Sequence, residues 1–426
     1  MLIVAILAVL LFLFFINVPI AFSIYLTALL FIWLADLPLT MFIQRMFSGI
    51  NSFPLLAIPL FIFVGTVMNH TSIANKLFDL AQALVGHIRG GLAHVNIVSS
   101  MLMAGISGSS TADAATSTKI MVPQMEKRGY PRPFSAAVTA ASATIAQIIP
   151  PSVSFIIFGW LAGVSIGKLF IAGIFPGMLI GLSLIVTVLI LSGKHGYGRD
   201  DKFAFSFKHL MKSFWDAKWS LLLALIIIGG ILSGVFTATE AAGVAAVYVF
   251  LLGILMREIR WRDIPVIVKE TVVDSAAVML IVSAAAPFGW ILTMEQIPQQ
   301  VFHLFTSITD NYYLLLLLIN LFLLLVGMFM DTAAALIIII PMFMPLIQQM
   351  GMDPIHFGVM MVFNLMIGQL TPPVGTLMFT TCSISNTSIV DFQKALVPFY
   401  IAMFVALLLI TYVPQFYMWL PNLVMR

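Results

Sequence analysis

Long apolar stretches alternate with short polar segments along the whole chain. Runs of about 20 mainly apolar residues, the length that an α-helix needs to cross a bilayer core, recur throughout the sequence. The first run continues to Leu34 without a basic leader or a small-residue cleavage site, so we expect it to remain in the mature protein rather than act as a signal peptide. The pattern predicts an all-α polytopic membrane protein.

The longest polar stretch, 194–218, divides this pattern into two halves. It is rich in lysine, and a second basic cluster follows at 257–269. Basic loops of membrane proteins favour the cytoplasmic side, so we expect both segments there, with an even number of crossings between them. The amphipathic part of the long stretch, 203–219, is typical of a helix that lies on the membrane surface.

Three pairs of anchors recur in the same order in the two halves. They are an Asp followed ten residues later by Pro, a Gln-x-x-Pro-Pro element, and another Pro at the same distance beyond it: Asp113 with Pro123 and Asp331 with Pro341, Gln147–Pro151 and Gln369–Pro373, and Pro176 and Pro398. Three ordered matches indicate an internal duplication.

The flanking charges indicate how the two repeats are oriented. The apolar stretch that holds Asp113 has basic residues at both ends, whereas the stretch that holds Asp331 has acidic residues at both ends. We therefore expect each stretch to be a re-entrant hairpin, one entering from the cytoplasm and one from outside, with turns at 107–110 and 327–331. Inverted repeats of this kind are common in secondary transporters with a midplane site.

This reading divides the chain into five parts. We expect N-terminal scaffold helices over 1–85 and the first half of a transport domain over 86–193, with a hairpin at 91–125 and a broken transmembrane helix at 134–165. A cytoplasmic loop or amphipathic linker follows over 194–218, then the scaffold helices of the second repeat over 219–309. The second half of the transport domain and the last span occupy 310–426, with a hairpin at 312–349 and a broken helix at 355–388.

The hairpin turns and the double prolines are the candidate cation sites. A helix end leaves carbonyls or amides unpaired, and two consecutive prolines break a span and free carbonyl oxygens, which are the hard ligands that Na⁺ requires. Close helix packing at the turns and simple kinks at the prolines are the alternatives. The candidate Na⁺ ligands are Ser107, Gly108, Ser109, Asp113, Pro150, Gly327, Asp331, Thr371, Gly375 and Thr376.

The candidate substrate contacts are polar residues beside these turns and breaks. They are Ser110, Thr111, Gln147, Ser152, Gln369 and Lys119. The two glutamines can instead secure the breaks, and Lys119 can snorkel or pair with an acid. The two aspartates can bind an ion or cap a helix, since Ser110–Asp113 has the form of a capping box. A second capping box, Thr237–Glu240, favours a structural role for its glutamate.

Composition excludes several other classes. Hydrophobic residues make up 61% of the chain and charged residues 9%, with a mean hydropathy of +1.10, so no water-soluble surface can be built from it. The single cysteine and seven scattered histidines give no metal or redox motif, and a net charge of +3 does not indicate nucleic acid. The sequence contains no Walker-type phosphate loop and no cluster of catalytic groups, which disfavours a nucleotide-driven pump or an enzyme.

At these elements the sequence resembles the large membrane subunit of tripartite ATP-independent periplasmic (TRAP) transporters, the DctM-type family. The segments that carry the resemblance span nearly the whole chain: Ser52-Phe-Pro-Leu-Leu-Ala-Ile-Pro-Leu-Phe61, Ser107-Gly-Ser-Ser-Thr-Ala-Asp113, Ile148-Ile-Pro-Pro-Ser152, Leu169-Phe-Ile-Ala-Gly173, Gly327-Met-Phe-Met-Asp331 and Leu370-Thr-Pro-Pro-Val-Gly375. One departure is Ala238, where the family pattern has proline, and we expect it to soften the start of the helix there.

The resemblance implies more than the spacing does. It implies an elevator-type transport domain in a bacterial inner membrane, Na⁺ coupling, a separate small subunit of four helices, and a periplasmic binding protein that delivers the substrate. The implied substrates are organic acids such as C4-dicarboxylates, sialic acid and other sugar acids. A channel or pore-type subunit is the alternative, and saturable, Na⁺-dependent uptake would separate the two.

Overall fold

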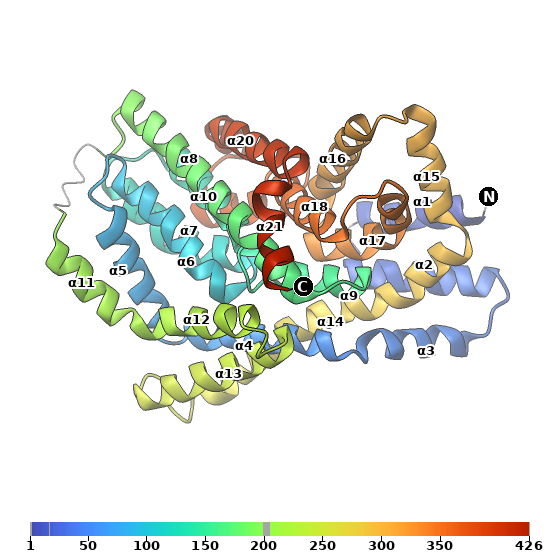
Figure 1. Ribbon diagram of the computed structural model, residues 1–426, viewed down its shortest axis with the longest axis horizontal. Helices are drawn as coiled ribbons and strands as arrows, with labels where there is room; N and C mark the ends of the chain where they lie inside the picture. Colours follow the sequence, from blue (N-terminus) through green and yellow to red (C-terminus); the bar gives the residue numbers. More distant parts are fainter. Residues whose placement is uncertain (1, 17, 199–204, 426) are drawn as a thin grey trace.

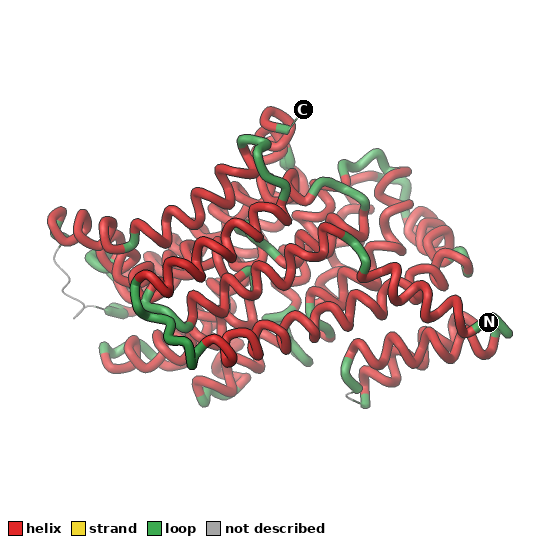
Figure 2. Tube along the Cα trace, turned by 90° about the horizontal axis from the view of Figure 1, so that it is seen from below, coloured by secondary structure: helices red, strands yellow, loops and turns green. Residues whose placement is uncertain are grey.

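Every regular element in the described part of the chain is helical. The computed structural model describes residues 2–16, 18–198 and 205–425, and Figure 2 shows helices joined by short loops. The elements in chain order are α1 (Leu2–Phe15), α2 (Ile20–Leu34), α3 (Leu39–Ile50), η1 (Phe53–Leu56), α4 (Ala57–Asn69), α5 (Ile73–Val85), α6 (Gly91–Ser107), α7 (Ser110–Lys127), α8 (Arg132–Ala143), η2 (Thr144–Gln147), α9 (Val153–Ala162), α10 (Ile166–His195), α11 (Phe207–Asp216), α12 (Lys218–Leu232), α13 (Ala238–Leu255), α14 (Ile264–Met294), α15 (Ile297–Ile308), α16 (Tyr312–Phe329), α17 (Thr332–Gln349), α18 (Pro354–Gly368), α19 (Thr376–Ser385), α20 (Ile389–Tyr412) and α21 (Gln415–Val424).

Several of these helices are suited to cross a membrane by length and composition. In the described ranges, six single helices are long and apolar enough to cross a membrane: α10, α13, α14, α16, α17 and α20. The bent pairs α3 with η1–α4 and α11 with α12, each turning by 61°, raise the number to eight if each counts as one span. The expected polytopic all-α fold is thus confirmed.

The order of elements repeats in the two halves. The hairpin α6–α7 is followed by α8, a break and α9, and the hairpin α16–α17 is followed in the same way by α18, a break and α19. Ahead of each hairpin lies a short amphipathic helix, α5 or α15, and ahead of that a long scaffold segment, bent in α3–α4 and continuous in α14. The helices α11 and α21 have no partner in this scheme.

The two repeats interlock through their hairpins. In Figure 1, α6 and α7 lie left of the centre while α16 and α17 lie right of it. The second arm of each hairpin packs against the broken helix of the other repeat, α7 against α19 and α17 against α9. This exchange brings the two hairpin turns and the two breaks into one central region.

Buried polar contacts hold each hairpin to its own broken helix. In the first repeat Asn96 donates to Thr139 Oγ1 at 2.6 Å and Ser100 donates to Ser142 at 3.2 Å. In the second, Asn364 Nδ2 donates to Asn320 Oδ1 at 2.6 Å and to its carbonyl oxygen at 3.0 Å. Hydrogen bonds inside an apolar interior resist exchange for water, so each hairpin and its broken helix form a firm unit.

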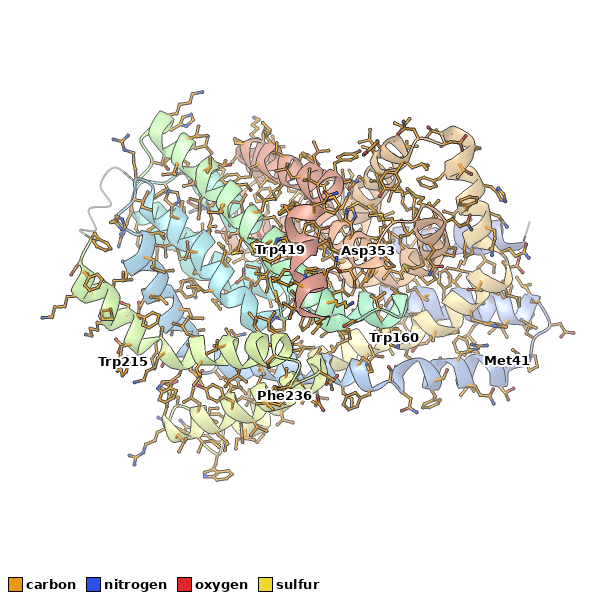
Figure 3. All side chains as sticks on the ribbon, in the orientation of Figure 1. Met41, Trp160, Trp215, Phe236, Asp353 and Trp419 are labelled. Carbon is orange, nitrogen blue, oxygen red and sulfur yellow. The ribbon has the colours of Figure 1, made fainter. Side chains whose placement is uncertain are left out.

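The scaffold helices form a separate layer beneath this unit. In Figure 1, α3, α4, α12, α13 and α14 run along its lower side, and α14 packs against α2, α3 and α4. The scaffold meets the hairpins where α4 contacts α6 and α14 contacts α17. Helix α11 and the start of α3 lie at opposite ends of the molecule, marked by Trp215 and Met41 in Figure 3.

Two local expectations can be compared with the structure. Thr237 and Glu240 form the predicted capping box at the start of α13, so the helix begins at Ala238 even without proline there. Of the predicted surface segment 203–219, residues 203 and 204 lie outside the described part, and the rest contains α11 and the start of α12. The boundaries between scaffold and transport domains stay predictions.

Candidate binding site

The first hairpin turns through a glycine and a serine cap. Gly108 ends α6 with φ +58°, a left-handed conformation that suits glycine. The Ser109 hydroxyl then accepts a hydrogen bond from the Ala112 amide at 3.4 Å and so caps α7. The capping box expected at Ser110–Asp113 is therefore wrong, because the helix starts one residue earlier than that pattern requires.

Asp113 lies buried within the first turns of α7. Its side chain is 2% exposed, and its Oδ1 accepts a hydrogen bond from the Ser117 hydroxyl at 3.4 Å. Its Oδ2 accepts no hydrogen bond of good geometry in the described part of the chain, although the Ser100 hydroxyl of α6 also lies near this carboxylate. A buried carboxylate oxygen without a partner is costly unless a cation or proton accompanies it.

The second hairpin places its aspartate four positions earlier, at the helix cap. Asp331 precedes α17, and its Oδ2 accepts a hydrogen bond from the Ala333 amide at 3.0 Å. The same residue accepts a second bond at Oδ1 from Gln369 Nε2 at 3.1 Å. Asp331 therefore matches Ser109 of the first hairpin in position, and the pairing of Asp113 with Asp331 suggested by their equal distances to proline is wrong.

The two glutamines make equivalent contacts within the two repeats. Gln147 Nε2 donates to the Ser110 hydroxyl at 2.8 Å, and Gln369 Nε2 donates to the Thr332 hydroxyl at 2.9 Å. In both contacts the two residues are 37 positions apart, and each hydroxyl belongs to the first residue of the second hairpin arm. The glutamines therefore tie each break to its own hairpin turn.

At the first break, serine hydroxyls complete the polar network. Ser152 donates to the Gln147 carbonyl oxygen at 2.6 Å and caps α9, and Ser154 donates to Gln147 Oε1 at 2.6 Å. The break approaches the hairpin closely, since a Cβ atom at Gly108 would lie 2.9 Å from the Pro151 carbonyl oxygen. Pro150 itself is buried against α10 and α12.

At the second break, carbonyl oxygens surround a glycine. Gly375 has φ +33°, and a Cβ atom there would lie 2.8 Å from the Thr371 carbonyl oxygen and 2.9 Å from that of Gln369. The Gly375 amide donates to the Met328 carbonyl at 3.0 Å, which joins this break to the second hairpin. The peptide bond within each proline pair is cis.

Two further oxygens of this break lack a hydrogen-bond partner. Thr376 Oγ1 and Gln369 Oε1 are both buried without a hydrogen-bond partner in the described part of the chain. Together with the two carbonyls they form a set of hard oxygen donors of the kind that binds alkali and alkaline-earth cations. The donor set at this break therefore fits a Na⁺ ion.

A cavity of about 460 Å³ joins the two hairpin turns. From the hairpins and breaks it is lined by Gly108, Ser109, Thr111, Ala112, Gln147, Val153, Ser154, Asp331 and Ala333. Its other wall belongs to the scaffold helices α4 and α14 and consists of Ile62, Gly65, Thr66, Asn69, Asp274, Ala277 and Val278. The volume suits a small molecule, and helix N-termini of both repeats open onto it.

Several predicted site residues gather at this cavity, and others do not. Ser110, Ser152 and Gln369 belong to the hydrogen-bond network of the glutamines, whereas the Thr371 hydroxyl donates to the Ile367 carbonyl at 3.0 Å. Gly327 packs against Gly368, where a Cβ atom would meet its Cα atom at 3.1 Å, which matches the close-packing alternative. Lys119 is exposed in the middle of α7 and is not among the lining residues. The side chain of Ser107 lies outside the described part of the structure.

The sequence pattern missed the scaffold side of the cavity. Thr66, Asn69 and Asp274 line it, but they lie in or at the end of helices that we assigned to the scaffold, and they belong to no repeated motif. An acidic residue at membrane depth was the one available signal, since Asp274 lies well inside α14.

The chain is similar to a known family of transport proteins over nearly its whole length. Residues 7–416 match the family described as "Tripartite ATP-independent periplasmic transporter, DctM component". The chain is 42% identical over 412 residues to the uncharacterized protein YgiK of Salmonella typhimurium, covering 96% of this chain and 94% of that protein. It is 40% identical over 411 residues to the sialic acid TRAP transporter large permease protein SiaM of Vibrio cholerae, covering 96% of each.

Two further comparisons extend these findings. The C4-dicarboxylate TRAP transporter large permease protein DctM of Pseudomonas aeruginosa is 38% identical over 379 residues, which cover 89% of this chain and 88% of that protein. Among solved structures, the YdaH transporter of Alcanivorax borkumensis superposes with a TM-score of 0.63 over 89% of each chain. At 13% sequence identity, this last likeness concerns the fold alone.

Proposed function

Because the chain belongs to the DctM component family of tripartite ATP-independent periplasmic transporters, we propose that it is the translocating subunit of a Na⁺-coupled importer of small organic acids. As a TRAP permease it is a transporter rather than an enzyme, and it is a multi-pass protein of the bacterial inner membrane. The coupling ion, the mechanism and the substrate class form the proposal. One observation carries it: a single cavity bounded by both hairpin turns.

Na⁺ binds beside each hairpin turn in this proposal. The first ion uses Asp113, whose buried Oδ2 is unpartnered, and carbonyl oxygens of the first break such as that of Pro151, which lies close to Gly108. The second ion uses Thr376 Oγ1 and the carbonyl oxygens of Thr371 and Gln369 around Gly375. Asp113 Oδ2 and Thr376 Oγ1 are buried without a hydrogen-bond partner in the described part of the chain, so an ion would supply the contact that each of them lacks.

The charges that line the cavity give a physical reason for coupling. Among its described lining residues the ionisable side chains are Asp274 and Asp331, and lysine, arginine and histidine are not among them. A carboxylate substrate would be repelled by such a wall unless cations were bound nearby. Two Na⁺ ions and the N-termini of α7, α9 and α17 supply that positive field, so the acid binds well only with the ions.

The position of the cavity supports an elevator motion. Asp274 and Ala277 belong to the first half of α14, which starts just after the basic cluster that we place in the cytoplasm. Asn69 ends α4, and the adjacent His70 pairs with Glu270 at 2.7 Å near the same end. The site thus lies against the cytoplasmic part of the scaffold. Uptake from outside requires the interlocked hairpin unit to shift along α4 and α14.

The partners follow from the family and from the names of the relatives. Relatives named large permease proteins imply a smaller membrane subunit, which we propose is a separate chain of four helices. A periplasmic binding protein would deliver the acid. Sialic acid, C4-dicarboxylates and related sugar acids are the substrates to test first, because relatives are named for sialic acid and C4-dicarboxylates.

Reconstitution tests this proposal. The chain is placed in liposomes with the small subunit and candidate binding proteins, and uptake of labelled acids is followed with and without an inward Na⁺ gradient. We expect saturable uptake that needs both the binding protein and Na⁺. Uptake that ignores Na⁺ would reject the coupling, and uptake that grows linearly with substrate would favour a channel.

A further inference from the structure

The helix α11 presents a large unpartnered apolar face. Four of its side chains are exposed by half or more, namely Phe207 at 66%, Met211 at 51%, Phe214 at 50% and Trp215 at 64%. On a helical wheel these four fall on one continuous stripe, whereas Leu210 and Ser213 face the rest of the protein. The exposed stripe is therefore a surface that something apolar must cover.

Lysines border this stripe along one edge. Lys208 and Lys212 follow Trp215 directly around the wheel, and both are exposed. Just beyond the helix, the Lys218 ammonium group lies 4.2 Å from the centre of the Trp215 ring and 5.2 Å from that of Trp219. An aromatic stripe with a lysine edge suits the boundary between acyl chains and anionic headgroups.

The orientation of α11 fits the same boundary. It meets α12 at an angle of 61°, so it turns away from the direction in which α12 crosses the membrane. It lies at the left end of the molecule in Figure 1, and Figure 3 shows Trp215 at this edge. This is the end that carries the basic segments, which we place at the cytoplasmic leaflet.

We propose that α11 is an anchor that binds anionic phospholipid of the cytoplasmic leaflet. Charge complementarity selects this occupant, because the lysine edge matches phosphate headgroups while the aromatic stripe matches acyl chains. The helix has no counterpart in the other repeat, so the duplicated architecture does not account for it. The inference stands apart from the coupling ion and the substrate.

The anchor has a direct route to the transport unit. Helix α11 packs against α5, α5 packs against α6, and Phe205 just ahead of α11 stacks edge-on against His87 beyond the end of α5 with ring centres 5.0 Å apart. Lipid bound at α11 therefore fixes the height at which α5 holds the first hairpin. Loss of the lipid would loosen this hold.

A lipid-quenching experiment tests the proposal without any transport assay. The buried Cys382 is first replaced by alanine, and Phe214→Cys carries a fluorescent label; Met211→Cys serves as a second position should the first variant fold poorly. The protein is reconstituted in phosphatidylcholine vesicles that contain either brominated phosphatidylglycerol or brominated phosphatidylcholine. We expect the anionic quencher to be at least about twofold more effective at equal mole fraction.

Charge variants provide the matched comparison. Lys208→Gln with Lys212→Gln should remove the preference for phosphatidylglycerol, whereas Lys168→Gln with Lys394→Gln, which removes the same charge from α10 and α20, should preserve it. Equal quenching by both lipids in the parent protein would overturn the proposal. Quenching by aqueous iodide in place of lipid would assign the stripe to water and overturn the proposal. Protection from both quenchers when the small subunit is present would assign the stripe to a protein partner and overturn the proposal equally.

Discussion

The two hairpin turns share a backbone plan but distribute their negative charge differently. In the first, a serine caps the helix and the carboxylate of Asp113 is buried deeper in it, with one oxygen unpartnered. In the second, the carboxylate of Asp331 is itself the cap, and both of its oxygens accept hydrogen bonds. In our proposal the first carboxylate therefore binds a cation through that oxygen, whereas both oxygens of the second already accept hydrogen bonds from amides.

The two breaks also differ, in the burial of their prolines and in the oxygens that they offer. Pro150 and Pro151 are buried beneath neighbouring helices, while Pro372 and Pro373 are exposed. The second break instead holds two carbonyl oxygens close to Gly375 and two buried side-chain oxygens, Thr376 Oγ1 and Gln369 Oε1, that have no hydrogen-bond partner in the described part of the chain. The two repeats thus share a chain path, and in our proposal they supply oxygen ligands in different ways. The first ligand set includes a carboxylate, and the second consists of neutral oxygens.

The largest effect should come from removing the unpartnered carboxylate. We expect Asp113→Asn to raise the Na⁺ concentration for half-maximal uptake by about 100-fold, since a charged ligand contributes on the order of 3 kcal/mol. Asp331→Asn should raise it less than about tenfold, because asparagine caps a helix as well as aspartate does. Uptake in proteoliposomes over a range of Na⁺ concentrations measures both. An equal loss of Na⁺ affinity in the two variants would contradict the difference proposed between the two turns.

The next effect concerns the polar contacts that hold hairpin to broken helix. Asn364→Leu leaves the Asn320 side-chain and carbonyl oxygens without this donor, and should destabilise the folded protein by about 2 kcal/mol. Ser142→Ala in the first repeat removes a weaker pair, at 3.2 Å, and should cost about half as much. Thermal unfolding in detergent ranks the two variants. A larger loss for Ser142→Ala would reverse the comparison.

A neutral ligand should matter less than the carboxylate. Thr376→Val keeps the shape of the side chain and removes a buried hydroxyl that has no partner. If that oxygen binds Na⁺, apparent Na⁺ affinity falls about tenfold while stability without Na⁺ stays the same or rises. Thr381→Val, one turn further along α19 and also unpartnered, is the control and should leave Na⁺ affinity in place. Similar affinities in both variants would leave Thr376 as a packing residue.

The smallest effect is expected at Lys119. Its exposure on α7, away from the cavity, predicts that Lys119→Gln changes the substrate concentration for half-maximal uptake by less than about twofold. Asp274→Asn on the scaffold wall should change it more, because this carboxylate faces the cavity. A large defect in Lys119→Gln alone would restore the lysine as a substrate contact.

Much of this molecule could be predicted from the sequence, because lipid requires membrane-spanning segments to be long and apolar, so that polar interruptions stand out. Polar interruptions in apolar runs marked the turns near Ser109 and Asp331 and the breaks at the double prolines. The alignment of the two aspartates failed because α17 contains two prolines. Pro345, not Pro341, stands as far from the first residue of its helix as Pro123 does.

The residues that the scaffold helices contribute to the cavity could not be predicted from the pattern of apolar and polar positions. Thr66, Asn69 and Asp274 reach the cavity because α4 and α14 cross beneath the hairpins, a relation set by tertiary packing. A threonine in a helix has the same local signature whether or not it lines a site: Thr66 lines the cavity and Thr271 does not, yet each donates to the carbonyl four residues before it. The periodicity of the sequence therefore does not distinguish a polar residue that lines the site from one that does not.

The response of the purified complex to Na⁺ tests the central claim, that the turns and breaks form one cation-dependent site. Its thermal unfolding is followed while NaCl replaces KCl at constant ionic strength, with Asp113→Asn beside the parent protein. We predict that Na⁺ raises the unfolding midpoint saturably in the parent and shifts it little in the variant, because only the folded state binds the ion. Equal midpoints in the two salts, or an unchanged response in Asp113→Asn, would contradict the account.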